Sequence, residues 1–203
     1  MIDAHRTPAR VQAWLLSLPY NWEGDRPTFR TFRGVVRHAT ANCIEAALAA
    51  TTIMEQHGYQ PLVLDLESRD HLDHVLFLYR GRDRRWGAIA KSRDYGLHGR
   101  KPRFRTVRDL VRSYMERYVD GTGRIIGYGV FDLDRLTRAD WRLSEGNVPS
   151  LERALIAAPH KPIAMSDSPY ERALRRYLAF KARRPDRDPG RVRGFYRGQE
   201  RWL

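Results

Sequence analysis

The chain has 203 residues, of which 42% are hydrophobic, so it can bury a sizeable core and form one domain with extensions. It contains a single cysteine, which excludes an internal disulfide, and no apolar run of about 18 residues that would predict a membrane span. Its formal net charge is +13, and Arg outnumbers Lys by 33 to 4. The first residues lack a signal-peptide pattern, so we expect a basic cytoplasmic protein without membrane association.

Two helices are predicted in the first third of the chain. Thr7-Pro8 marks the start of an N-terminal helix, because Thr is a good N-cap and Pro suits the first helical position. The second helix is predicted over Cys43–His57, where Asn42-x-x-Glu45 has the spacing of a capping box. This run lacks Pro and Gly, is nearly apolar all round and is followed by Gly58, a typical C-terminal stop. It therefore reads as a helix buried on most sides, with the cysteine at its first position.

Three short strands are expected after this helix, at Pro61–Leu66, His74–Tyr79 and Trp86–Ala90. The polar segment between the second and third strands predicts a turn, so these two strands should form a hairpin. If the turn centres near Asp83, His74 lies opposite Ser92. Asp94 then follows two residues later on the same face.

A thiol at a helix N-terminus and a histidine at the start of a strand suggest a cysteine nucleophile and its base. A helix N-terminus and a nearby imidazolium lower a thiol pKa from its usual value of about 8.5. The Cys43 thiolate would attack a carbonyl, and His74 would protonate the leaving group. Ser92 or Asp94 would hold the imidazole in the required tautomer. The alternative is that Cys43 is a small buried hydrophobic residue.

This order of a Cys-containing helix, a strand, a His-containing strand, a turn and a Trp-containing strand resembles the transglutaminase-like superfamily, relatives of the papain-like cysteine proteases. The resemblance covers about residues 10 to 120 and extends to bacterial transglutaminase-like proteins of unassigned function. Matching segments are His57–Leu64, Leu18–Asn21, Trp86–Ser92 and the helix near Arg108–Leu110. Family members usually carry Asp after the aromatic residue of the third strand, whereas this chain has Ala90, Lys91 and Ser92 there, and Asp94 slightly later.

The resemblance implies an α+β fold with a papain-like core, in which the nucleophile helix packs on a mostly antiparallel sheet. It also implies acyl transfer at an amide bond of a peptide or protein substrate, either to water or to an amine, with Cys43 and His74 as the catalytic pair. Asn21, Trp22 and Trp86 are candidate substrate-binding residues. Phosphate-loop and dinucleotide fingerprints are missing from the sequence, so no cofactor is expected. The rival hypothesis is a non-catalytic adaptor that uses the same fold to bind a peptide or nucleic acid.

The remaining elements divide the chain into two parts. A catalytic domain over residues 1–165 would also contain a helix over Thr106–Val119, a strand over Ile125–Leu133 and a short helix over Ser150–Ala158. Residues 166–203 would form a C-terminal helix that opens at Ser168-Pro169, followed by a basic tail.

Charge and metal binding suggest further interpretations. Eleven of the basic residues and four acidic ones fall within 170–203, so this Arg-rich tail could bind nucleic acid or an acidic partner. A solvated tail in an Arg-rich chain explains the same charge, since no nucleic-acid-binding motif accompanies it. Asp70-His71-x-x-His74 places zinc-type ligands close together, but no second cysteine completes a tetrahedral set, so no metal is expected.

Overall fold

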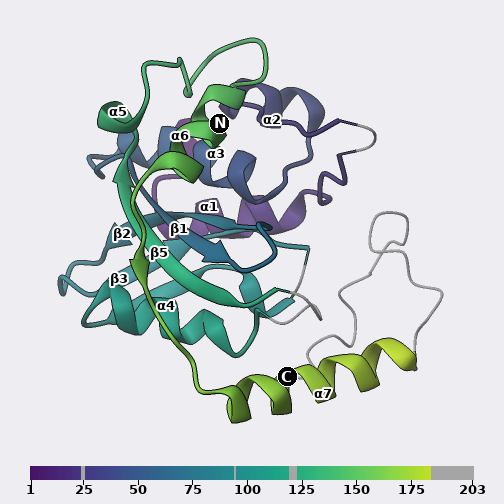
Figure 1. The fold of residues 1–203 in the computed structure, drawn as a ribbon. Coiled ribbons are helices and arrows are strands. Elements are labelled where there is room, and N and C mark those ends of the chain that lie inside the picture. Colours follow the sequence, from purple (N-terminus) through teal and green to yellow (C-terminus); the bar gives the residue numbers. More distant parts are fainter. Residues whose placement is uncertain (24–25, 94, 119–122, 184–203) are drawn as a thin grey trace.

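The computed structural model describes residues 1–23, 26–93, 95–118 and 123–183. Within these residues the fold is mixed α+β, with one sheet of six antiparallel strands in the order β4-β3-β2-β1-β5-β6 (Figure 1). The strands are β1 (Leu62–Ser68), β2 (His74–Arg80), β3 (Trp86–Ile89), β4 (Arg100–Phe104), β5 (Ile125–Asp132) and β6 (Lys161–Pro162). The α-helices are α1 (Pro8–Ser17), α2 (Phe32–His38), α3 (Cys43–Glu55), α4 (Val107–Met115), α5 (Leu133–Leu136), α6 (Pro149–Ala157) and α7 (Asp167–Ala182).

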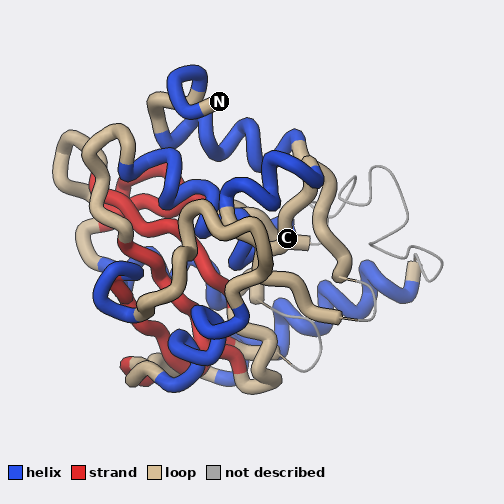
Figure 2. The backbone as a smooth tube through the Cα atoms, turned by 90° about the horizontal axis from the view of Figure 1, so that it is seen from above, coloured by secondary structure: helices blue, strands red, loops and turns tan. Residues whose placement is uncertain are grey.

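Helices cover both faces of the sheet. Helices α1, α2, α3 and α6 lie on one face and α4 lies on the other, as Figures 1 and 2 show. Side chains alternate along each strand between these two layers. In β2, for example, Phe77 joins the core beneath α1 and α3, whereas Leu76 and Leu78 join the core beneath α4. The sheet therefore has apolar side chains packed on both of its faces, and alternate residues of each strand point to opposite faces.

Helix α3 begins as the sequence predicts. Asn42 is its N-cap, the Asn42 side chain accepts a hydrogen bond from the Glu45 N–H, and the Glu45 carboxylate accepts one from the Asn42 N–H. The complete capping box leaves Cys43 as the first helical residue. The side chains from Ile44 to Met54 are buried, which confirms the expectation of a helix enclosed on most sides.

The predicted hairpin also forms with the predicted register. Arg80 pairs with Trp86 and Phe77 with Ile89, so the β2–β3 turn is centred at Asp83. Strand β1 pairs with β2 on one side and with β5 on the other, which makes β1 a central strand. The start of β2 and the middle of β1 are thereby brought next to each other, close to the N-terminus of α3.

The sequence analysis did not predict α2, β4, α5 or β6, and the first two have a clear physical reason. Helix α2 contains a glycine and two adjacent valines, which are weak helix formers, and it is held by packing against α3. Strand β4 carries Pro102 between charged residues, a composition that only an edge strand tolerates, and β4 is indeed the last strand of the sheet. Both elements form because a neighbour supplies the burial or the hydrogen bonds that their own sequences do not favour.

The C-terminal helix is present as α7, which extends away from the sheet along the lower edge of the molecule (Figure 1). Arg124 contacts it through an ion pair with Asp167 at 2.7 Å and by lying over the ring of Tyr170. The basic tail predicted beyond the helix lies, from residue 184 onward, outside the described residues. Among the helices that the structure describes, none is both long enough and apolar enough to span a bilayer.

Candidate functional site

A cavity of about 400 Å³ opens at the N-terminus of α3. Its walls come from the loop after α1, the start of α3, the β1–β2 loop, the segment after β3 and helix α6. Both Cys43 and His74 line it, so the structure brings the two predicted catalytic residues to one cavity. They reach it from different sides, because α3 covers one face of the sheet and the His74 ring packs edge-on against Tyr114 of α4, with the ring centroids 6.2 Å apart.

Among the described residues, the hydrogen-bonding contact of the Cys43 thiol is with a main-chain carbonyl and not with a charged group. Its side chain is partly exposed toward the cavity, and Sγ lies 3.9 Å from the carbonyl oxygen of Asp73, to which the S–H can donate. Burial raises the pKa of the Cys43 thiol to about 11, and the nearby carboxylates Glu23 and Asp65 add to this rise. The sequence predicts instead that the helix N-terminus and a nearby imidazolium lower this pKa. Desolvation and negative charge outweigh the helix N-terminus here, so the thiol is neutral at pH 7.

The His74 imidazole is fixed by a main-chain carbonyl. Its Nε2 lies 2.8 Å from the carbonyl oxygen of Leu97, which can only accept, so Nε2 carries the proton and Nδ1 is the basic nitrogen. Burial lowers the pKa of His74 to about 4, so the ring is neutral at pH 7. Among the described contacts the thiol and the imidazole each bond to a carbonyl rather than to one another.

Of the two residues predicted to orient His74, the structure describes Ser92. Ser92 lines the cavity, and its backbone N–H donates to Nδ1 of His98 at 3.3 Å. Asp94 lies outside the described residues. A described contact that orients the imidazole comes from Leu97, at the end of a short 3₁₀-helix. Sequence reasoning missed it because any residue type can supply a backbone carbonyl, so the contact leaves no signature in the sequence.

Of the three predicted substrate-binding residues, two line the cavity. Trp22 does so beside Tyr20, with the ring centroids 5.1 Å apart. Asn21 also lines the cavity, but its Nδ2 donates to Thr28 Oγ1 at 2.6 Å and to Glu45 Oε2 at 3.1 Å, so both of its amide hydrogens are used within the protein. Trp86 is not brought to the site, because it lies at the turn end of the β2–β3 hairpin, beneath the guanidinium of Arg80.

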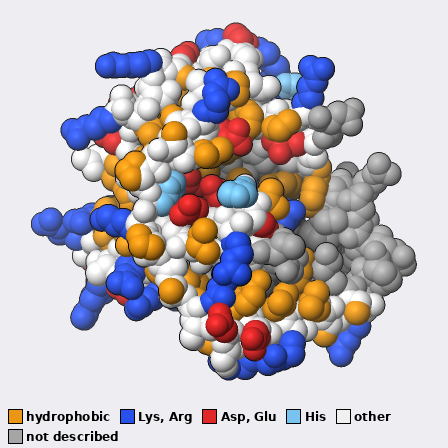
Figure 3. All heavy atoms as spheres, viewed as in Figure 1, with side chains coloured by type: hydrophobic (Ala, Val, Ile, Leu, Met, Phe, Trp, Pro, Cys, Tyr) orange, Lys and Arg blue, Asp and Glu red, His pale blue; other side chains and the backbone are white. Residues whose placement is uncertain are grey.

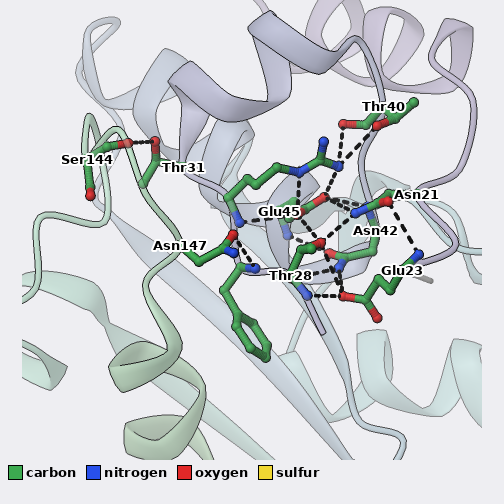
Figure 4. A network of polar contacts seen from close by, with 11 residues as sticks. Asn21, Glu23, Thr28, Thr31, Thr40, Asn42, Glu45, Ser144 and Asn147 are labelled. Carbon is green, nitrogen blue, oxygen red and sulfur yellow. Dashed lines mark hydrogen bonds and ion pairs between the residues drawn. The ribbon is translucent and has the colours of Figure 1, made fainter. Parts of the chain in front are cut away.

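A network of polar contacts fixes the loop after α1 against the start of α3 (Figure 4). At its centre is the fully buried Glu45, whose Oε1 accepts from the Nε of Arg30 at 2.7 Å and whose Oε2 accepts from the Nη2 at 2.8 Å. Thr28 and Asn21 donate to the same carboxylate. The network holds one wall of the cavity rigidly beside Cys43. The capping-box spacing predicts the role of Glu45 at the helix terminus, but not its pairing with Arg30.

The floor of the cavity contains a buried carboxylate that sequence reasoning also missed. Asp65 of β1 is 1% exposed and lines the cavity. Its Oδ2 lies 3.4 Å from Nε2 of His160, and within the described residues neither its Oδ1 nor that Nε2 has a hydrogen-bond partner. The only sequence signal is an acidic residue in the middle of an apolar strand, which is unfavourable unless the carboxylate has a partner or a function.

Metal binding finds no support in these residues. Asp70 is engaged in its own turn, where Oδ1 accepts from Ser68 Oγ at 2.6 Å and from the Leu72 N–H at 3.2 Å. Throughout the part of the chain that the structure describes, no group of three or more His, Cys, Asp or Glu side chains is arranged to hold a metal ion. Comparison with protein-family models and with curated proteins finds no match to this chain.

Proposed function

We propose that this chain catalyses cysteine-dependent acyl transfer at an amide bond, in a transglutaminase-like fold with a papain-like core. The observation that carries the proposal is the meeting of Cys43 and His74 at one cavity, with the thiol at the first position of a capped helix. A second observation supports the base: the Leu97 carbonyl fixes the His74 tautomer in which Nδ1 can accept a proton.

The reaction would start from a neutral pair. As Sγ of Cys43 attacks the amide carbonyl carbon, the thiol proton passes to Nδ1 of His74, directly or through one water. The carbonyl oxygen becomes an oxyanion, for which the Cys43 backbone N–H at the start of α3 is a candidate donor. When the tetrahedral intermediate collapses, the C–N bond breaks and the departing amine takes the proton from the imidazolium. A thioester on Cys43 remains.

The thioester would then pass its acyl group to water or to an amine. His74 removes the proton from the incoming nucleophile and returns it to the departing thiolate, which restores the neutral pair. Hydrolysis and transamidation share every residue of this scheme. A peptide or protein is the substrate class that we propose, because the cavity is open to the surface along the β1–β2 loop and α6.

A non-catalytic binding module is the second candidate. The raised pKa of the Cys43 thiol favours it, because a neutral, desolvated thiol is a poor nucleophile in the absence of a working base. In that case the cavity would bind a peptide without turning it over. Nucleic-acid binding through the Arg-rich residues after 184 belongs to the same candidate, and those residues lie outside the described part of the chain.

The deciding experiment measures turnover of a panel of peptide anilides, with and without hydroxylamine as the acyl acceptor. Cys43→Ala should abolish release of the anilide, and His74→Gln should lower kcat by about 100-fold or more, the usual range for loss of a general base. His38→Gln, which removes an exposed imidazole, is the matched control and should keep wild-type activity. Hydroxamate formation would identify transamidation.

Failure is equally specific. If the wild-type chain shows no turnover with any substrate, or if Cys43→Ala retains it, the acyl-transfer proposal is wrong. Peptide binding without turnover would then support the binding module.

A further inference from the structure

The unpartnered oxygen of Asp65 is the most unusual feature of the cavity. A buried carboxylate normally has all of its acceptor positions filled, because an unpaired buried polar atom costs about 1–3 kcal/mol. His160 approaches only Oδ2, at 3.4 Å, and leaves Oδ1 without a partner although the residue is 1% exposed. Because Asp65 lines the cavity, a ligand there could supply the missing donor.

The charges around Asp65 indicate that the missing hydrogen-bond donor is a cation. The carboxylates of Glu23, Asp65, Asp73 and Glu152 line the cavity, and among the described lining residues Arg93 is the one Lys or Arg. Burial raises the pKa of Asp73 and of Glu152, and repulsion from Asp65 and Glu23, respectively, raises them further. The cavity therefore holds crowded negative charge in a chain whose net charge is +13. A cation bound there would relieve this repulsion.

The space-filling view agrees with this contrast. On the face shown in Figure 3, two histidines and several acidic side chains lie near the centre, with Lys and Arg side chains above and below them and at the edges. A cavity lined by several carboxylates raises the local concentration of cations.

The wall of the cavity indicates what carries the cation. Leu72 and Ile156 are 55% and 64% exposed, and both line the cavity. Leu155 lies beside Ile156 on the same helix, and the aromatic rings of Tyr20 and Trp22 form another wall. Exposed apolar side chains next to buried acids suit a ligand with an aliphatic stem and a charged tip.

We propose that this cavity contains a subsite that binds an ammonium group on an aliphatic stem, with Oδ1 of Asp65 as its main acceptor and Asp73 and Glu152 as supporting charges. An ammonium fits better than a guanidinium, because one free oxygen cannot make the paired parallel bonds that Arg forms with a carboxylate. The group is a recognition element and not the acyl acceptor. Its source is either a lysine side chain of a peptide or a free alkylamine, which share this chemistry.

The test is isothermal titration calorimetry on the full chain with two matched probes. Acetyl-lysine-amide and acetyl-norleucine-amide differ mainly in the ammonium group, so we expect the lysine probe to bind at least 10-fold more tightly. Asp65→Asn should reduce its affinity about 10-fold or more, whereas Asp3→Asn, the control at a highly exposed acid, should leave it unchanged. n-Butylammonium distinguishes the two sources of the ammonium group. If it binds as tightly as the lysine probe, the ligand is a free alkylamine. If it binds much more weakly, the ligand is a lysine side chain of a peptide.

Several results would overturn the subsite: equal affinity for both amide probes, no binding of the lysine probe, or unchanged affinity in Asp65→Asn. If Asp65→Asn does not fold, Glu152→Gln on the surface of α6 takes its place and should weaken the lysine probe about threefold, an unchanged affinity counting against the subsite. Binding needs no turnover. A chain that binds the lysine probe but has no activity would retain the subsite and lose the proposed acyl transfer.

Discussion

Two buried carboxylates stand close to the start of α3 and are treated in opposite ways. Glu45, fully buried, accepts hydrogen bonds on both oxygens from Arg30 and from three neighbouring residues, Asn21, Thr28 and Asn42. Asp65, 1% exposed, has a histidine near one oxygen and no hydrogen-bond partner for the other. The hydrogen-bond acceptors of Glu45 are filled by protein donors, whereas Asp65 lines the cavity.

This difference separates a structural charge from a charge that can act on a ligand. Burying a carboxylate is tolerated when hydrogen bonds replace its water, as they do around Glu45. The network around Glu45 holds the loop after α1, which forms one wall of the cavity. The carboxylate of Asp65 supports no such wall. One side of the cavity is thus held by the hydrogen-bond network of Glu45, and the other side carries the Asp65 carboxylate, whose Oδ1 accepts no hydrogen bond from the described residues.

The largest loss of stability is expected from substitution of Glu45. Glu45→Gln places an amide NH₂ against donors and leaves Arg30, whose side chain is 13% exposed, without its counter-charge. Breaking one partner of a buried pair should cost about 3–5 kcal/mol of unfolding free energy, measured by urea denaturation at pH 7. Glu171→Gln, on the exposed surface of α7, is the control and should change stability by less than about 0.5 kcal/mol. A loss below about 1 kcal/mol at Glu45 would mean that the network does not hold this wall.

Acid should destabilise the fold through the buried histidines near the cavity. Burial lowers the pKa of His74 to about 4 and that of His98 to about 3, against an ordinary value of 6.5. The unfolded chain therefore binds protons first as the pH falls, so the stability present above pH 6.5 is lost toward pH 4. The raised pKa values of Asp73 and Glu152 act in the opposite sense.

A histidine variant isolates this contribution. Between pH 7 and pH 4.5, His74→Gln should lose less unfolding free energy than the wild type, by on the order of 2 kcal/mol. His38→Gln should follow the wild-type curve, because its imidazole is exposed. Parallel curves for wild type and His74→Gln would show that the His74 imidazole can take up a proton within the folded state.

The smallest change in stability is expected from substitution of Asp65. Asp65→Asn removes the charge beside His160 but no hydrogen bond at Oδ1, so the expected loss of stability is about 1 kcal/mol, smaller than at Glu45. The raised pKa of His160 should fall at the same time, since Asp65 is the main cause of that rise, and NMR titration of the imidazole measures it. A destabilisation as large as that of Glu45→Gln would make Asp65 a structural residue.

Local signals in the sequence were sufficient for the elements that carry the candidate pair. The capping box set the first residue of α3, and a polar turn centred at Asp83 set the register of the β2–β3 hairpin. Both rest on contacts between residues close in the chain, which depend little on the rest of the fold. These signals place Cys43 at the start of α3 and His74 at the start of β2, whereas the transglutaminase-like family and the chemistry stay proposals.

The tertiary structure alone decided the surroundings of that pair. It placed the Leu97 carbonyl against the His74 imidazole, kept Trp86 away from the cavity, and brought Asp65 and His160 together. It also raised the pKa of the Cys43 thiol, because burial and neighbouring carboxylates outweigh the helix terminus. Each of these contacts joins residues that lie far apart in the chain or uses a main-chain atom. Residue type and spacing carry no record of either, since both depend on how the layers pack.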